Sequence, residues 1–181
     1  MANPISRSMH DVGLAAWFGG TLANAVALNS AAAEAGDASS TGKVANAGWD
    51  RWTPVNAMAI GAHLIGSVGQ LGGNRNRLQA QEGVASMAVT KTMLTAAALG
   101  ATAYSRMLGQ KVSKYQDVPA ESGTAPSSST PSDAAKAQKT LAMLQWVVPA
   151  ITGALVVVSS YAGEQQRATE VHKGLAARIL S

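Results

Sequence analysis

The sequence predicts an all-α fold, an integral membrane four-helix bundle with a short amphipathic C-terminal helix. Its 24 charged Lys, Arg, Asp and Glu residues are clustered, and the clusters leave long stretches almost free of charge. Each stretch is at least 22 residues long, and about 20 residues are enough to cross the hydrocarbon core of a bilayer. We therefore expect membrane spans at about 12–33, 52–74, 83–105 and 140–163.

Two other interpretations stay open. A soluble alanine-rich bundle would also be helical, although surface helices need charges at helical spacing and these stretches lack them. The N-terminal segment, with Arg7, an apolar run and three alanines at 31–33, is similar to a cleavable signal peptide. The run is long and contains Gly19, Gly20 and Asn24, which favours retention as a span; cleavage would leave three spans.

The segments between the spans suit a membrane protein. Trp49 and Trp52 precede the second span and are typical of the interfacial aromatic belt, and Pro54 suits the first turn of a helix. The short turn "NRNRLQAQE" makes the second and third spans antiparallel neighbours. Residues 107–139 are rich in Ser and Pro and predict a flexible polar loop.

The orientation follows from the C-terminal end of the chain. Six cations flank one side of the predicted bundle and seven the other, so the positive-inside rule does not decide. Residues 164–181 have apolar positions at helical spacing with cations among them, which predicts an interfacial helix on an anionic leaflet. We therefore expect a multi-pass protein of the bacterial cytoplasmic membrane, the bacterial origin being suggested by the Ala and Gly bias, with both termini in the cytoplasm.

The composition excludes several classes of chemistry. The chain has no cysteine, which rules out disulfides, thiolate nucleophiles and Cys-ligated metals. The pI near 9.6 comes from basic residues that flank the spans, and no cluster of basic and aromatic residues indicates nucleic acid. Paired carboxylates, a phosphate loop and metal-ligand spacing are all absent from the sequence. We therefore predict no catalytic residues, no cofactor, no metal and no nucleic-acid partner.

Four polar residues inside the spans form the candidate site. Counted from the centre of each stretch at about 1.5 Å per residue, His63, Asn24, Lys91 and Thr95 fall close to mid-depth. An ionisable group in hydrocarbon is costly unless it faces a cavity or a partner, so these residues could line a ligand or proton site. The alternative is structural, with His63, Asn24 and Thr95 as interhelical hydrogen-bonding groups and Lys91 reaching the interface.

A haem bound by two histidines is the sharpest enzymatic possibility for a membrane four-helix bundle. The second histidine near a span is His10, about 12 residues from the centre of its stretch. That places it roughly 19 Å from His63 in depth, so we do not expect both to bind one iron within a chain. Ligation across subunits stays open.

Three short segments carry a resemblance. They are "HDVGLAAWFGG" at 10–20, "GWDRWTPVN" at 48–56 and "AYSRMLG" at 103–109. With the long connector before the last span, the chain resembles the family of small four-span membrane proteins named after transmembrane protein 205, and more distantly the anthrone-oxygenase-like membrane proteins. The resemblance implies a four-helix integral membrane protein and no catalytic role. The corresponding positions are His10, Trp17, Gly19, Gly20 and Arg106.

The sequence supports three hypotheses for function. Small residues four apart, such as Gly19 and Ala23 or Ala62 and Gly66, let helices approach closely. They favour a non-enzymatic accessory or scaffold subunit that packs in the lipid bilayer against a second copy or a larger complex. The alternative is a small carrier or channel with a mid-membrane polar site. A cofactor-dependent oxidoreductase is suggested only by the distant anthrone-oxygenase likeness.

Overall fold

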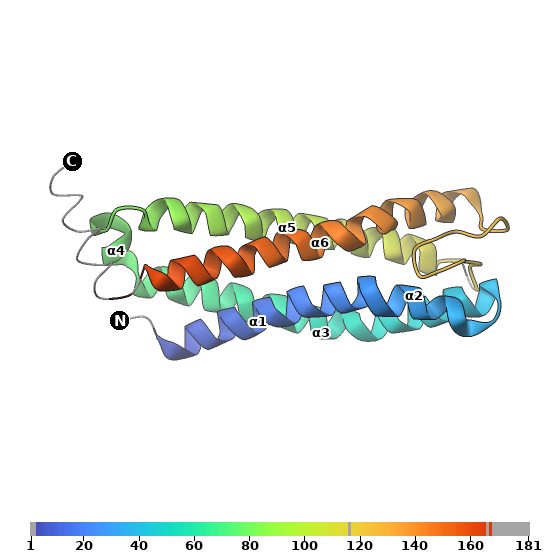
Figure 1. Ribbon diagram of the computed structural model, residues 1–181, viewed down its shortest axis with the longest axis horizontal. Coiled ribbons are helices and arrows are strands. Elements are labelled where there is room, and N and C mark those ends of the chain that lie inside the picture. The colour runs from blue at the N-terminus through green and yellow to red at the C-terminus, as the bar shows by residue number, and fades with distance from the viewer. Residues whose placement is uncertain (1–2, 116, 166, 168–181) are drawn as a thin grey trace.

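The computed structural model describes residues 3–115, 117–165 and 167 (Figure 1). These residues form helices and connecting turns, and no strand occurs among them. The helices, in chain order, are α1 (Pro4–Ala23), the π-helical η1 (Asn24–Leu28), α2 (Asn29–Ala31), the 3-10 helix η2 (Ala32–Ala35), α3 (Ala38–Gly73), α4 (Arg75–Ala80), α5 (Val84–Ser113) and α6 (Ser132–Glu164).

Three of the four expected spans are confirmed as helices that are long and apolar enough to cross a membrane. They are Pro4–Ala35, Val84–Ser113 and Ser132–Glu164. The remaining expected span, residues 52–74, lies in α3, which is the longest helix but falls short in apolar composition. The mean hydropathy of its uncharged stretch is lowered by Asn56, His63 and Gln70 and by five glycines.

Helix boundaries follow from capping chemistry at α1 and correct the sequence prediction at α3. The side chain of Asn3 accepts a hydrogen bond from the Ile5 amide at 3.0 Å, and Pro4 occupies the first turn. Pro54, expected at a helix start, lies inside α3. The helix begins at Ala38 because Asp37 and Gly36 supply the boundary before it, and Pro54 removes only one backbone donor from its interior.

Asp37 is the N-cap of α3. Its Oδ1 accepts from the amides of Ser39 and Ser40 at 3.0 and 2.9 Å, and its Oδ2 accepts from the Ser40 hydroxyl at 2.7 Å. The hydrogen bonds from Ser40 hold the pKa of Asp37 below its ordinary value of 3.8. The carboxylate therefore stabilises the start of α3 above that pH, and the contribution is lost as the pH falls through the lowered pKa.

We expect Asp37→Ala to increase hydrogen exchange at the Ser39 and Ser40 amides at neutral pH, because their acceptor is lost. In the native protein the same increase is expected on acidification below pH 3.8. Asp37→Asn is the matched control, since asparagine caps without a titrating group and its exchange at these amides should show no such acid step. Equal protection in the alanine variant would contradict the assignment.

The long helices pack as two pairs. Figure 1 shows them running side by side, with α1 beginning and α6 ending at the same end of the molecule. The most extensive packing joins α1 to α3 and α5 to α6, and α1 also packs on α6, whereas α3 and α5 make few contacts. The molecule therefore has one loosely packed seam, between α3 and α5.

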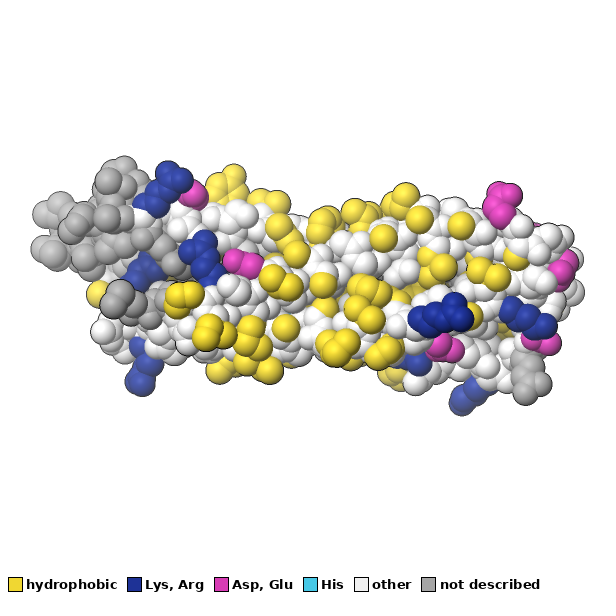
Figure 2. Space-filling view, turned by 90° about the horizontal axis from the view of Figure 1, so that it is seen from below, with side chains coloured by type: hydrophobic (Ala, Val, Ile, Leu, Met, Phe, Trp, Pro, Cys, Tyr) yellow, Lys and Arg dark blue, Asp and Glu magenta, His cyan; other side chains and the backbone are white. Residues whose placement is uncertain are grey.

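Hydrophobic and charged side chains occupy different parts of the surface along the long axis of the molecule. Figure 2 shows hydrophobic side chains gathered over the middle of the visible face, with most of the charged side chains toward its two ends. Exposed Val12, Met58, Val68, Met93 and Val157, each more than half exposed, show that the apolar surface includes all four long helices. Such an outward apolar surface suits contact with lipid.

Two glycines allow α1 and α3 to approach closely. A Cβ on Gly66 would lie 2.3 Å from the amide nitrogen of His10 and 2.5 Å from the Ser6 carbonyl oxygen. A Cβ on Gly13 would lie 2.5 Å from both the Ala59 carbonyl oxygen and the His63 nitrogen. These small residues make contacts between two helices of the same chain. The contacts set the register of α1 against α3, which brings His10 beside His63.

The connector between α5 and α6 differs from the predicted flexible loop over 107–139. Residues 107–113 and 132–139 belong to α5 and α6. Between them Val118 and Ala120 are buried, each 1% exposed, and the Ala120 amide donates to the Ala38 carbonyl at 2.9 Å. Val118 rests on Gly42, where a side chain would leave no room. These two apolar residues within a polar segment help to hold it against α3.

Most of the predicted C-terminal helix at 164–181 lies outside the described residues. The structure ends α6 at Glu164, and residue 167 is the last that it describes.

Candidate functional site

The structure brings together two of the four predicted site residues. His63 is 0% exposed, and its Nε2 lies 3.4 Å from Oγ1 of Thr95 on α5. Its Nδ1 lies 3.4 Å from the backbone carbonyl oxygen of His10. Both contacts are long for hydrogen bonds. His63 therefore sits in a packed setting, in agreement with the structural alternative for this residue.

Asn24 lies elsewhere, and Lys91 is one helical turn from Thr95, toward the start of α5. Asn24 begins the π-helical segment η1 and lines neither of the two cavities described below. Lys91 faces α1 near the end of the bundle where α1 begins, beside Arg7 and Asp11. The four residues do not form one mid-depth site.

The expected separation of His10 and His63 is wrong. Their ring centroids are 4.5 Å apart, with the planes tilted by 46°. The depth estimate placed the centre of each uncharged stretch at one level, but the glycine contacts align α1 and α3 with His10 opposite His63 and Gly20 opposite Trp52. The separation in depth therefore no longer argues against an intrachain haem.

A packed layer crosses the middle of the molecule. It contains one or two fully buried residues from each long helix: Trp17, His63, Ala98, Thr152 and Leu155, all 0% exposed. The Trp17 ring lies 6.1 Å from that of His63, and its Nε1 donates to Thr102 Oγ1 at 3.2 Å. This layer separates two cavities, one toward each end of the molecule.

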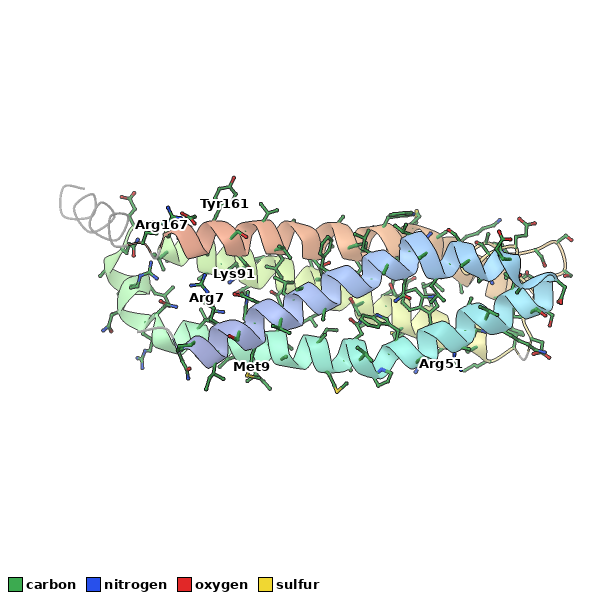
Figure 3. The ribbon with its side chains drawn as sticks, turned by 60° about the horizontal axis from the view of Figure 1, so that its bottom comes forward. Arg7, Met9, Arg51, Lys91, Tyr161 and Arg167 are labelled. Atoms are coloured by element: carbon green, nitrogen blue, oxygen red, sulfur yellow. The ribbon has the colours of Figure 1, made fainter. Side chains whose placement is uncertain are left out.

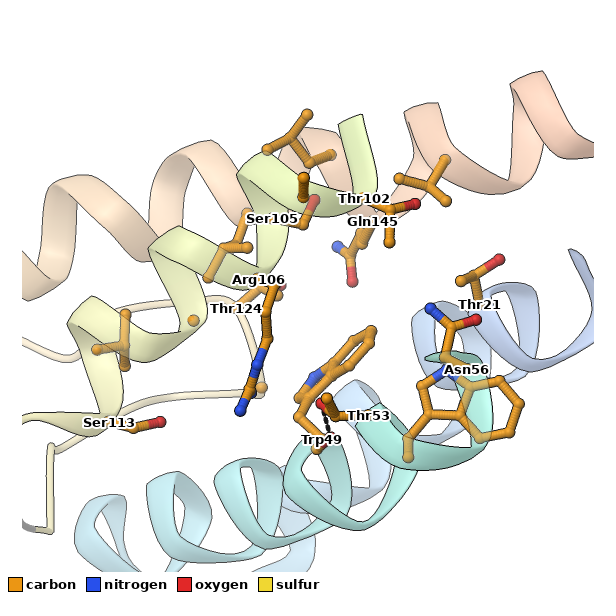
Figure 4. A pocket seen from close by; sticks show the side chains of 18 of the residues that line it. Thr21, Trp49, Thr53, Asn56, Thr102, Ser105, Arg106, Ser113, Thr124 and Gln145 are labelled. Atoms are coloured by element: carbon orange, nitrogen blue, oxygen red, sulfur yellow. Dashed lines mark hydrogen bonds between the residues drawn. The ribbon is translucent and has the colours of Figure 1, made fainter. Parts of the chain in front are cut away.

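The larger cavity lies in the loose seam between α3 and α5 and has a volume of about 310 Å³. Its wall is mainly apolar, with Ile60, Leu99 and Val148 among the lining residues. Figure 4 shows Arg106 from α5 and Trp49 from α3 extending toward each other across it, with Thr21, Asn56 and Thr102 around the inner part. Arg106 also pairs with Asp50, Nη1 to Oδ1 at 3.2 Å.

The smaller cavity, of about 230 Å³, lies at the other end, among α1, α3, α5 and α6. Its lining includes the charged side chains of Arg7, Asp11 and Lys91. The two cavities therefore differ in chemistry: the one near the connector is apolar, and the one near α4 is charged.

Buried polar atoms without a hydrogen-bond partner gather at these cavities. Within the described ranges there are six, and all belong to cavity-lining residues. The larger cavity has Trp52 Nε1, Asn56 Oδ1 and Gln138 Oε1, and the smaller has His10 Nε2, Gln70 Nε2 and Ser159 Oγ. Buried polar atoms are seldom left unsatisfied, so each cavity holds groups suited to a ligand or water.

Sequence reasoning missed both cavities. Trp52 and Asn56 are one helical turn apart on α3, which was a usable signal for a common face. Gln138, 2% exposed, falls in the predicted flexible loop and gave no signal. The charged cavity depends on Arg7, Asp11 and Lys91, which come from two helices and meet only in the folded protein.

Comparison with known proteins adds no assignment: no protein family, no curated protein sequence and no solved structure matches this chain. The resemblance to the family named after transmembrane protein 205 therefore stays a prediction.

Proposed function

We propose that this protein is a non-enzymatic integral membrane four-helix bundle that binds a small, largely apolar molecule in the cavity between α3 and α5. The observation that carries the proposal is that cavity, with its apolar wall and its unpartnered polar atoms. It lies in a bacterial cytoplasmic membrane, with the α4 end on the cytoplasmic side.

The fourth crossing is α3. Because α1 begins and α6 ends at the same end of the molecule, the number of crossings is even. The close contacts at Gly13 and Gly66 hold α3 along α1, so a membrane around α1 also surrounds α3. Its polar residues tend to turn inward: His63 is buried, and Asn56 lines the larger cavity.

The cavity fits an uncharged molecule with an apolar body and one or two polar groups. Ligand sites have volumes from about 300 Å³ and apolar walls with a few placed polar groups. Trp52 Nε1 can donate to a carbonyl oxygen, and the oxygens of Asn56 and Gln138 can accept from a hydroxyl. Gln138 is almost fully buried, so a ligand that satisfies it removes an unfavourable buried group.

The test uses the neutral, apolar fluorophore N-phenyl-1-naphthylamine and the full chain in lipid nanodiscs. Trp49 and Trp52 lie in the cavity wall, so a bound fluorophore should accept excitation energy from them. We expect saturable transfer in the native protein and its loss in Ala103→Phe, because Ala103 lines the cavity and a phenyl ring would fill part of it.

The matched control is Ala97→Phe, the same substitution on the same helix at an exposed position outside the cavity wall. It should keep the saturable transfer. Transfer that rises linearly with fluorophore in the native protein, as expected for fluorophore dissolved in lipid alone, would refute binding. So would identical saturation in the native protein and Ala103→Phe.

A scaffold that packs against a second copy or a larger complex is the second candidate. Gly19, Gly61 and Gly100 have open space where a Cβ would stand, so they form outward small-residue positions that another helix could approach. A defined oligomer or a stoichiometric partner on purification in mild detergent would favour this role. The carrier hypothesis centred on His63 has less support, because neither cavity reaches that residue.

A further inference from the structure

The smaller cavity combines cationic side chains with unused hydrogen-bonding groups. Four helices line this open cavity of about 230 Å³, and its polar lining consists of Arg7, His10, Asp11, Gln70, Lys91, Ser159 and Ser160. Figure 3 shows Arg7 and Lys91 close to the end of the bundle where α1 begins.

The charge of this cavity is not balanced. Asp11 is its one carboxylate, and both of its oxygens have partners: Oδ2 lies 3.6 Å from Arg7 Nε, and Oδ1 lies 2.7 Å from His10 Nδ1. Lys91 makes no hydrogen bond and no ion pair within 4 Å in the ranges that the structure describes, and Asp11, the carboxylate that attracts it, is already in contact with Arg7 and His10. An ammonium group on a membrane helix without a direct partner is costly, and such groups mark functional sites. With neutral His10, the lining carries one excess positive charge.

Three further groups in the cavity have no partner. Gln70 Nε2 and Ser159 Oγ are donors. His10 is 1% exposed, and its Nε2 is buried and unpaired. Because Nδ1–H of His10 donates to Asp11, Nε2 carries the lone pair of the neutral ring and can accept a proton from a bound acid group.

We propose that this cavity binds a phosphate-type oxyanion. Lys91, Arg7, Gln70 and Ser159 supply the donors for its oxygens. His10 Nε2 accepts a hydrogen bond from the P–OH of hydrogen phosphate, or from a hydroxyl group of the headgroup that carries the phosphate. Lys91 lies seven residues into α5, about 10 Å from the helix end, a depth within reach of the polar headgroups. The phosphate comes either from a phospholipid headgroup or from a free phosphate. This site is separate from the apolar cavity, so its failure would leave the proposed function untouched.

Two measurements on the full chain distinguish the two sources. The first is calorimetric titration with inorganic phosphate in a neutral detergent. The second is native mass spectrometry after reconstitution with phosphatidylglycerol, with phosphatidylcholine as the zwitterionic comparison. We expect Lys91→Gln to weaken binding about tenfold or more in whichever measurement detects it, because a hydrogen bond to a charged group is lost.

Lys111→Gln is the matched control, since it removes the same charge from an exposed position at the opposite end of α5 and should leave binding unchanged. Ser159→Ala keeps the proposal testable if Lys91→Gln misfolds, because that hydroxyl has no partner in the protein and its loss should weaken binding alone. Phosphate binding identifies a free oxyanion, and retention of phosphatidylglycerol alone identifies a headgroup. No binding, or binding unaffected by Lys91→Gln and Ser159→Ala, overturns the proposal.

Discussion

Replacing Gly66 by leucine is expected to separate α1 from α3 and to destabilise the protein by about 3 kcal/mol or more, at or above the upper end of the usual cost of overpacking. The reason is geometric: a Cβ at this position would lie 2.3 Å from one backbone atom of α1 and 2.5 Å from another. Backbone atoms cannot move aside without the helix. The contact between His10 and His63 would be lost with the helix pairing.

The measurement is the thermal unfolding midpoint in detergent. Gly61→Leu is the control, because the same residue is introduced on the same helix where nothing lies within 4 Å of the new Cβ. Gly66→Ala should give an intermediate loss, because its single methyl group requires a smaller shift. Equal midpoints for Gly61→Leu and Gly66→Leu would show that the two helices do not approach as described.

Truncation of Trp17 to alanine is the second large effect that we expect. Its indole is fully buried in the central layer, contacts Ala59 and Ala98 and donates to Thr102. Truncating a buried aromatic side chain to alanine costs about 3–5 kcal/mol, through lost contacts and the cavity left behind. The vacated space would adjoin Ile60, Leu99 and Thr102, which line the apolar cavity, so that cavity should enlarge.

Two variants test how much of the lost stability comes from the burial of the indole and how much from its hydrogen bond to Thr102. Trp146→Ala removes the same side chain from a position that is 51% exposed and should cost far less. Trp17→Phe keeps most of the ring but loses the donor to Thr102, so it should fall between the native protein and Trp17→Ala. The readouts are the unfolding midpoint and the saturable fluorophore transfer described above. A Trp17→Ala protein as stable as Trp146→Ala would contradict the packed central layer.

The helices could be predicted from the sequence, but their relative depth could not. Charge-free length marks a span, and it identified three helices that can cross a membrane. The length of a charge-free stretch contains no information on the register of one helix against its neighbour, because this register depends on where the two backbones can approach closely. Gly13 and Gly66 decide it here: they place His10 opposite His63, whereas centring each stretch separated the same residues by roughly 19 Å.

The candidate site was predicted only in part for the same reason. His63 and Thr95, which the sequence placed together, do lie in contact, because the packing of the helices brings the last third of α3 beside the first half of α5. Lys91 was expected with them, but α5 continues to Ser113, which puts Lys91 toward one end of its helix. The cavity at the seam was not predictable, because it exists where α3 and α5 fail to pack closely.

The two helix pairs are fastened at both ends. Near one end the connector joins them, with the Gly123 amide donating to the Asn29 carbonyl and Ala120 bound to Ala38. At the other end Arg77 of α4 donates to the backbone carbonyl of Gln165, just beyond α6, at 2.8 Å. Between these two fastenings α3 and α5 pack loosely, and the apolar cavity lies in the part of this seam toward the connector. In the proposed four-span protein, a molecule bound in this cavity would first dissolve in the bilayer and arrive by lateral diffusion, so its occupancy would follow its partition coefficient more closely than its concentration in water.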